Sequence, residues 1–227
     1  MGRTRWTTIK NNLHPDIEYL MRDFRRRNQM YYYPTCQMSI DETLFLFKGR
    51  VRFRQRMPMK PQGTGLKYFI IADSNGFIWD TFLYKGRETT ELNFEESSQK
   101  TDRKESQTVN IVHYFLQTLS KTGHVLFMDK YYGGLNVMEE VLNAKQHGVV
   151  ACQNNRPTDL FSECLAAGKQ TFLLFNNNVG FDKETKGKWD WAYSRIRGKQ
   201  PILAISFHDK KVCNFLSSVD NHHGLQR

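Results

Sequence analysis

Two aspartates stand where a carboxylate could do chemistry. Asp41 lies inside an alternating apolar segment and is followed by Glu42, and Asp129 ends the largely apolar run 124–128. A carboxylate inside an apolar strand costs free energy unless it faces water or finds a partner. Acidic residues at the carboxyl ends of strands in α/β sheets often face a ligand crevice. Two ordinary interpretations stay open: Asp41 on a half-exposed sheet face, and Asp129 in an Asx turn or helix cap.

Taken together, the two aspartates indicate a metal site. Two carboxylates a few ångströms apart repel each other and cannot both ionise cheaply without a cation. Mg²⁺ and Mn²⁺ are hard cations that prefer oxygen ligands. A pair of such ions about 3.5–4 Å apart can activate a water and stabilise a leaving phosphate oxygen. We therefore interpret Asp41 and Asp129 as catalytic, metal-binding residues, with two ions expected in an active form.

The charge of the chain indicates an anionic partner. Lys and Arg together number 33 against 23 Asp and Glu, which gives a net charge of +10, and a surplus this large favours nucleic acid. Arginines alternate through 50–56, so in an extended segment they would share one face and match phosphate oxygens; a solvated charged loop is the alternative. The predicted DNA-binding residues are Lys48, Arg50, Arg52, Arg54, Arg56, Lys60, Lys67 and Lys130.

The periodicity of apolar residues predicts the elements that must position these side chains. Alternation favours strands over 37–47, 67–73 and 77–84, and helical spacing favours helices over 15–28, 107–119 and 135–146. Arg25, Arg26 and Arg27 would end the first helix, and Gly148 would cap the last. With short strands over 124–128 and 148–152, the predicted order is βββ-α-β-α-β.

The remainder of the chain is predicted to be irregular or β-rich. The polar stretch 86–106 is expected to form a loop. After residue 154 the sequence changes, and strand-like pieces suggest a separate lobe or an insertion; they fall at 171–175, 190–195, 201–207 and 212–216.

Several function classes lack support in the sequence. There is no run of 18 apolar residues, so we expect no membrane partner. The four cysteines form no Cys-x-x-Cys pair, which argues against zinc ribbons and thioredoxin-like chemistry. Phosphate-binding glycine loops and the serine-hydrolase elbow are also missing.

Ordered along the chain, several motifs resemble the piggyBac transposase family. The likeness covers about residues 10–220 and rests on Ser39-Ile40-Asp41-Glu42, Phe47-Lys48-Gly49-Arg50, Met57-Pro58-Met59-Lys60-Pro61, Met128-Asp129-Lys130-Tyr131-Tyr132 and Phe207-His208-Asp209-Lys210-Lys211-Val212.

The resemblance implies an α/β (α+β) fold with a ribonuclease-H-like core and a β-rich insertion. The implied divisions are an N-terminal helical segment over 1–34, the catalytic core over 35–153 and an insertion lobe over 154–227, with the C-terminal part of the core missing.

The resemblance also implies a DDD transposase that cuts and transfers DNA strands with Mg²⁺ or Mn²⁺. Asp41 matches the first catalytic aspartate of the family and Asp129 the second, whereas the third has no counterpart in this chain. Double-stranded DNA, TTAA targets, a nuclear location and a homodimer of the full-length family are implied as well. Lys130 replaces the usual asparagine, which leaves a catalytically inactive, transposon-derived DNA-binding protein as the alternative.

Overall fold

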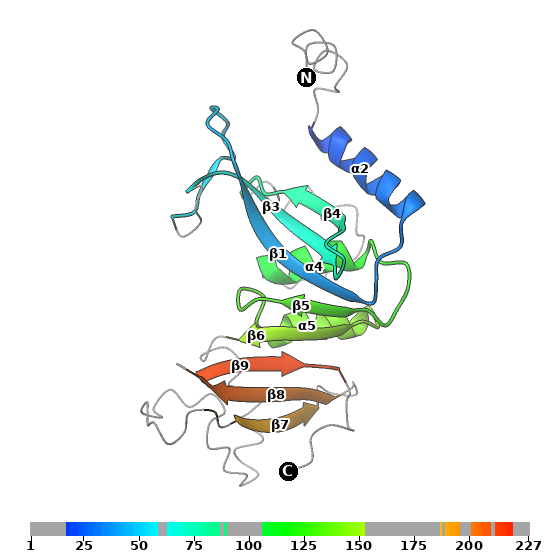
Figure 1. Ribbon diagram of the computed structural model, residues 1–227, viewed down its shortest axis with the longest axis vertical. Coiled ribbons are helices and arrows are strands. Elements are labelled where there is room, and N and C mark those ends of the chain that lie inside the picture. The colour runs from blue at the N-terminus through cyan, green and yellow to red at the C-terminus, as the bar shows by residue number, and fades with distance from the viewer. Residues whose placement is uncertain are drawn as a thin grey trace.

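Strands and helices make up most of the part of the chain that the computed structural model describes, residues 17–58, 63–86, 89, 106–152, 187, 189–195, 201–209 and 212–219. In chain order (Figure 1) they are α2 (Ile17–Tyr31), β1 (Gln37–Leu46), β2 (Gln55–Arg56), β3 (Thr64–Asp73), β4 (Ile78–Leu83), α4 (Gln107–Leu116), β5 (Val125–Met128), α5 (Leu135–Asn143), β6 (His147–Cys152), β7 (Trp189–Arg195), β8 (Pro201–His208) and β9 (Val212–Ser217).

One mixed sheet of nine strands connects the whole fold. Its order is β2-β3-β1-β5-β6-β9-β8-β7, and β4 pairs with the outer side of β3. Strands β1, β5 and β6 are parallel, whereas β3 runs antiparallel to both β1 and β4. The predicted order of three strands, helix, strand, helix and strand is therefore present, with the two-residue β2 added between β1 and β3.

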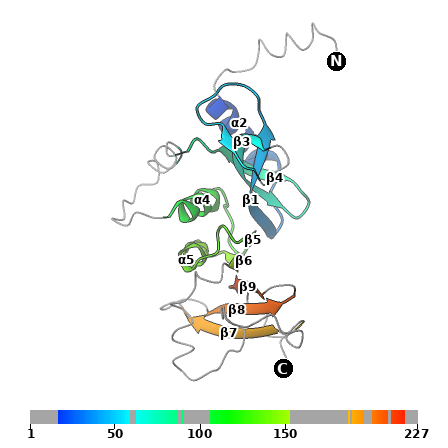
Figure 2. The ribbon, with the colours of Figure 1, turned by 90° about the vertical axis from the view of Figure 1, so that its left-hand side faces the viewer.

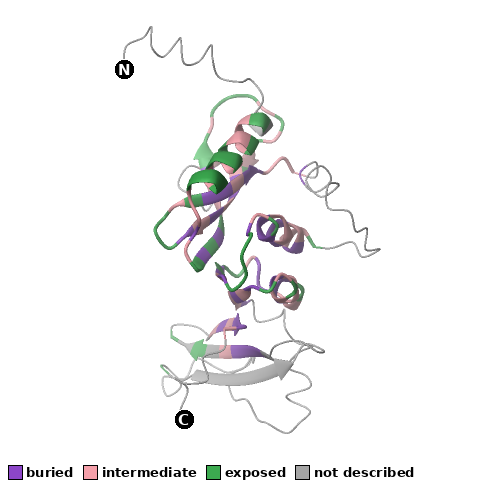
Figure 3. Cartoon of the chain, turned by 90° about the vertical axis from the view of Figure 1, so that its right-hand side faces the viewer, coloured by how far each residue is buried: buried purple, intermediate pink, exposed green. Residues whose placement is uncertain are grey.

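The core lies between this sheet and two helices. Helices α4 and α5 connect parallel strands and cover one face of the sheet (Figure 2), as expected for crossover helices. Met38 and Ile40 of β1 are buried on that face while Ser39 and Asp41 are exposed, which is the alternation of a strand covered on one side. Figure 3 shows the buried residues gathered at this boundary between sheet and helices.

Helix α2 packs beside β4 rather than joining the main core. The Asn28 side-chain amide donates to the carbonyl oxygens of Ile78 at 2.8 Å and Trp79 at 3.1 Å. Arg25 forms an ion pair with the fully buried carboxylate of Asp80, with Nε and Oδ2 2.8 Å apart, and lies 4.6 Å from the ring centroid of Tyr114 in α4. This one arginine therefore ties α2 to both β4 and α4. None of the described helices is long and apolar enough to span a membrane.

Each of the three predicted helices ends about three residues from the predicted position, and for two of them the local reason is visible. Helix α2 continues to Tyr31. The first residue whose backbone is kept from the helical conformation is the one before Pro34, so the arginine triplet lies inside the helix. After α5 the left-handed residue is Lys145, with φ of 56°. Gly148 pairs with Leu126 inside β6 and is not a helix cap.

The strands beyond residue 154 continue the core sheet. Strand β9 pairs antiparallel with β6, and β8 and β7 follow. Buried Ser218 fixes the junction: its N–H donates to the Gly148 carbonyl at 2.9 Å, and its Oγ accepts from the Gly148 N–H at 2.8 Å. The division into a core and an insertion lobe stays a prediction, and the strand predicted at 171–175 and most of the 86–106 loop lie outside the described residues.

The Arg25–Asp80 pair provides a test of how α2 is held. Arg25→Ala leaves a buried carboxylate without its counterion, and burial already raises the pKa of Asp80 against the opposing effect of Arg25. We expect the free energy of unfolding, measured by urea denaturation, to fall by about 2–3 kcal/mol, less than for a fully enclosed pair because Arg25 is 29% exposed.

The control for this prediction is Arg26→Ala on the same helix. Arg26 pairs with Asp23 at the surface, where solvent screens the interaction, so we expect no measurable change. Equal losses in the two variants would contradict the assignment of the buried pair as the main attachment of α2.

Candidate metal centre

Parallel pairing of β1 with β5 brings Asp41 and Asp129 together. The last register pair of these strands is Ile40 with Met128, so each aspartate is the next residue along its strand. Strand β1 continues to Leu46, so Asp41 lies mid-strand beside the point where β5 ends, and the two side chains meet there. Ligand oxygens of Asp41, Asp129 and Glu42 all lie within 4.8 Å of one another.

Glu42 is the member of this cluster that the sequence interpretation passed over. Consecutive strand residues point to opposite faces, which argues against Asp41 and Glu42 sharing a site. Strand β5 ends beside Ile40, however, so Asp129 lies past the end of β5, where side chains from either face of β1 can reach it. The sequence signal for Glu42 is its position next to Asp41. That signal indicates a shared site only once it is known that β5 ends beside Ile40.

A tight turn holds Asp129 in place. Its Oδ1 accepts the N–H of Tyr131 at 2.8 Å, and its carbonyl oxygen accepts the N–H of Tyr132 at 3.1 Å. The Asx turn that the sequence left as an alternative is therefore present, and it coexists with the acidic cluster. In β1 the Oδ1 of Asp41 accepts the N–H of Glu42 at 2.8 Å.

The donor set of the cluster fits a hard divalent cation. Its three groups are carboxylates, and Asp41 and Asp129 are exposed while Glu42 is half-buried. Three like charges at this spacing repel, and a cation that takes oxygen ligands relieves the repulsion. Asp41, Glu42 and Asp129 are the residues that could hold such an ion.

Lys67 is packed beside this centre by aromatic rings. Its Nζ lies 4.6 Å from the ring centroid of Phe69, 5.5 Å from that of Tyr84 and 5.4 Å from that of Tyr131. Tyr131 belongs to the turn that carries Asp129, so the ammonium group is held close to that turn. Lys130, the next residue after Asp129, is exposed.

The arginine-rich segment differs from the predicted extended strand. Residues Arg52 and Phe53 form a turn, and only Gln55 and Arg56 pair with β3. The Arg54 Nη1 donates to the Gly49 carbonyl at 3.2 Å, which closes the turn. The predicted extended conformation is therefore wrong at Arg52 and Phe53. The basic residues of this segment are all exposed: Lys48, Arg50, Arg52, Arg54 and Arg56. Lys60 lies outside the described residues.

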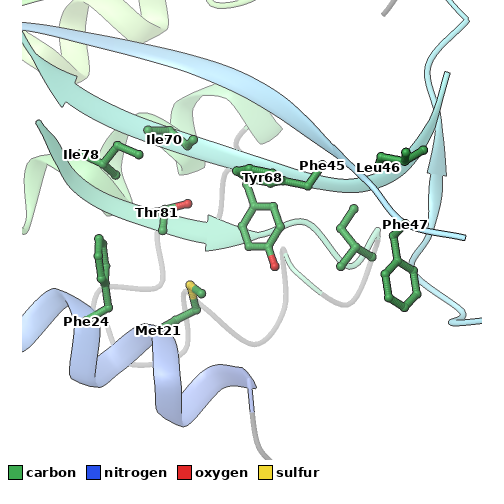
Figure 4. Close-up of a pocket in the computed structure, with 10 residues that line it drawn as sticks. Met21, Phe24, Phe45, Leu46, Phe47, Tyr68, Ile70, Ile78 and Thr81 are labelled. Atoms are coloured by element: carbon green, nitrogen blue, oxygen red, sulfur yellow. The ribbon is translucent and has the colours of Figure 1, made fainter. Parts of the chain in front are cut away.

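An apolar hollow lies between α2 and the sheet. It is an apolar cavity of about 370 Å³ lined by Met21 and Phe24 of α2 and by Tyr68 and Ile70 of β3. Figure 4 shows these side chains facing one another. Tyr68, whose pKa is raised by burial, is the one titratable group in the lining, so the acidic cluster is the better candidate for chemistry.

Two comparisons place the chain among known proteins. The family described as Transposase IS4 matches residues 4–227. The solved structure described as "Cryo-EM structure of piggyBac transposase synaptic complex with hairpin DNA" is similar with a TM-score of 0.66 and 20% identity, over 98% of this chain. This chain spans 41% of the length of that one. The predicted ribonuclease-H-like α/β fold is confirmed, while the family match carries the IS4 name and not the predicted piggyBac name.

At Gly133 the turn that carries Asp129 packs closely against β6. A Cβ at this position would collide with the Ala151 carbonyl oxygen and lie 2.9 Å from the Cys152 Cα, whereas nothing lies within 4 Å of a Cβ at Gly134. We expect Gly133→Ser to lower the free energy of unfolding by about 1–3 kcal/mol through overpacking. The same substitution at the adjacent Gly134 should be neutral or slightly stabilising, because Gly134 is the N-cap of α5, a position that favours serine.

Chemical denaturation of the two glycine variants measures this difference. Equal unfolding midpoints for Gly133→Ser and Gly134→Ser would contradict the close packing of the turn on β6.

Proposed function

The chain belongs to the Transposase IS4 family, and on that premise we propose that it is a piggyBac-like catalytic domain that cuts and transfers DNA strands with divalent metal ions. The observation that carries the proposal is that Asp41 and Asp129 lie close together in a ribonuclease-H-like sheet, although they are 88 positions apart in the sequence. The similar piggyBac transposase is described in complex with hairpin DNA, which supports DNA as the substrate.

In this proposal the carboxylates of Asp41 and Asp129 bind Mg²⁺ or Mn²⁺. Two bound ions would supply an activated water and stabilisation of the leaving 3′ oxygen of a phosphodiester. The protein contributes the fixed separation of the two carboxylates, set by the β1–β5 register. The Asx turn after Met128 limits the freedom of Asp129, so little ordering remains to be done when the ions bind.

Basic residues around the centre are proposed to hold the DNA. Lys67 and Lys130 lie next to the Asp129 turn, where they can contact the phosphates nearest the reacting bond. The exposed Lys48–Arg56 segment leaves the end of β1 beyond Asp41 and can follow the DNA backbone. The net charge of +10 also favours binding to DNA, which is a polyanion.

Three further features are carried over from the family resemblance as proposals. They are a preference for TTAA target sites, assembly of the whole protein as a homodimer, and action in the nucleus.

Strand cleavage tests the catalytic proposal. With Mg²⁺ and a labelled duplex that ends in a hairpin, we expect a nicked product on a denaturing gel. Asp41→Asn and Asp129→Asn should each reduce its rate by at least about 10²-fold, because each removes a charged metal ligand from the reacting centre. Asp209→Asn, which removes an exposed carboxylate between β8 and β9, is the control and should react like the unsubstituted protein.

Binding without cleavage would favour the alternative, a catalytically inactive DNA-binding protein. The replacement of the family's asparagine by Lys130, beside Asp129, is the feature that favours this alternative. Product formation that is equal in the Asp41→Asn variant would end the catalytic proposal, and no DNA affinity even at low salt would end both.

Salt dependence tests the role of the basic segment. Removing two phosphate contacts with Arg50→Ala and Arg56→Ala should lower the slope of log K against log salt by about 1.8. The charge-matched control removes Arg26 and Arg27, which pair with Asp23 on α2, and its slope should stay near that of the unsubstituted protein. Fluorescence anisotropy over a salt series measures both, and an equal fall in the control would indicate a general charge effect.

A further inference from the structure

The apolar hollow between α2 and the sheet lies on the same sheet face as Asp41. In the antiparallel register of β1 with β3, Asp41 is opposite Ile70 and Phe45 is opposite Leu66. Alternate residues of a strand point to one face, and directly opposed residues of paired strands share that face. Ile70, Leu66 and Phe45 all line the hollow (Figure 4). The lining therefore begins beside the candidate metal centre and extends along β1 to Phe45.

Exposed apolar side chains are concentrated at this hollow. Nine large apolar side chains are exposed in the described part of the chain, and four of them line it: Phe24, Phe45, Leu46 and Ile78. Phe45 is 54% exposed, and its ring meets that of Tyr68 edge-on with centroids 5.3 Å apart. Apolar surface that gathers in one place and stays uncovered is typical of a binding site.

The lining offers aromatic surface and few polar groups. None of the ten described residues that line the hollow is charged, and only Tyr68 and Thr81 carry a hydroxyl. The Thr81 hydroxyl already donates to the Phe69 carbonyl at 3.0 Å. A phosphate finds no charged partner in such a lining, whereas the flat face of a nucleobase can stack on an exposed ring such as that of Phe45.

Basic side chains stand at the end of the hollow that is remote from the metal centre. Phe47, the lining residue that follows β1, leads directly into exposed Lys48 and Arg50. On the opposite wall, exposed Arg22 belongs to α2. These cations match the phosphates of a DNA strand, and the metal centre at the other end is proposed to take the reacting phosphate. A strand bound at both ends crosses the apolar lining, and its bases are the part that this lining suits.

We propose that the hollow is a subsite for an unpaired nucleobase of the DNA substrate, stacked on the exposed ring of Phe45. The adjoining phosphates then contact Lys48 and Arg50. Asp41 and Phe45 are four residues apart in β1, which is about 13 Å along a strand, so the stacked base lies a few nucleotides from the reacting bond. Stacking tolerates any base. The inference rests on the proposed function, because it adds a contact to the same DNA.

DNA binding in EDTA at low salt tests the subsite apart from catalysis. For the full chain and a duplex that ends in a hairpin, fluorescence anisotropy should show that Phe45→Leu lowers the affinity about tenfold, because leucine keeps an apolar contact and loses the stacking. A fully paired duplex offers fewer free bases and should lose less affinity. Phe207→Leu, which changes a 40% exposed phenylalanine of β8, is the matched control and should leave both affinities unchanged.

Photo-cross-linking locates the stacked base without relying on a variant. With 5-iodouracil at each unpaired position of the hairpin in turn, irradiation should join one position to the peptide that carries Phe45, as identified by mass spectrometry. The cross-link should disappear in Phe45→Leu and persist in Phe207→Leu. Absence of a cross-link to this peptide from every unpaired position would overturn the subsite.

Salt dependence separates stacking from phosphate contacts. Phe45→Leu removes no positive charge, so the slope of log K against log salt should stay unchanged while the affinity falls at every salt concentration. Unchanged affinity in this variant would overturn the subsite, leave the proposed strand cleavage standing, and favour an apolar protein segment as the occupant of the hollow. No DNA affinity of the unsubstituted protein would end both proposals.

Discussion

The register of β1 against β5 is the constraint on which the candidate site depends. Ile40 and Met128 form the last pair of these two strands, and both are buried under the helices. A shift of one residue would turn every side chain of β1 to the opposite face and expose Met38 and Ile40. The hydrophobic core therefore fixes the register, and the register in turn fixes the distance between Asp41 and Asp129. The energy that holds the two carboxylates together comes from apolar burial a few ångströms away.

The protein deals with acidic groups in two different ways. Asp80 is fully buried and is matched by the guanidinium of Arg25 at 2.8 Å, an arrangement that attaches α2. The cluster at the end of β5 instead collects carboxylates at the surface, where Asp41 and Asp129 each accept a nearby backbone N–H. The first arrangement has its counterion within the chain, whereas the donor set of the second fits a divalent cation. This contrast distinguishes a structural ion pair from an acidic cluster whose ligands fit a metal ion.

Periodicity predicted the core elements because apolar burial alone sets them. The alternation of β1, with Met38 and Ile40 inward and Asp41 outward, can be recognised in the amino-acid sequence. Glu42 could not be predicted as a cluster member, because its phase assigns it to the other face and the end of β5 is a tertiary fact. The prediction of an extended arginine segment failed for a similar reason. Alternating arginines resemble a strand in the sequence, but Arg54 bonds to the Gly49 carbonyl across a turn there. Likewise Gly148 has the residue type of a helix cap, whereas the structure uses it for pairing in β6.

Strand β9 bears on the candidate metal centre although it lies two positions away from β5 in the sheet. Without β9, strand β6 would be an exposed edge with unpaired backbone groups. The Ser218 bonds to Gly148 and the pairing of Phe215 with Ala151 hold that edge. Gly133 packs on β6 at the same residue, Ala151, so the position of β6 determines where the turn that carries Asp129 lies. The strands after residue 154 are thus mechanically part of the site: they fix the surface against which the second aspartate is placed.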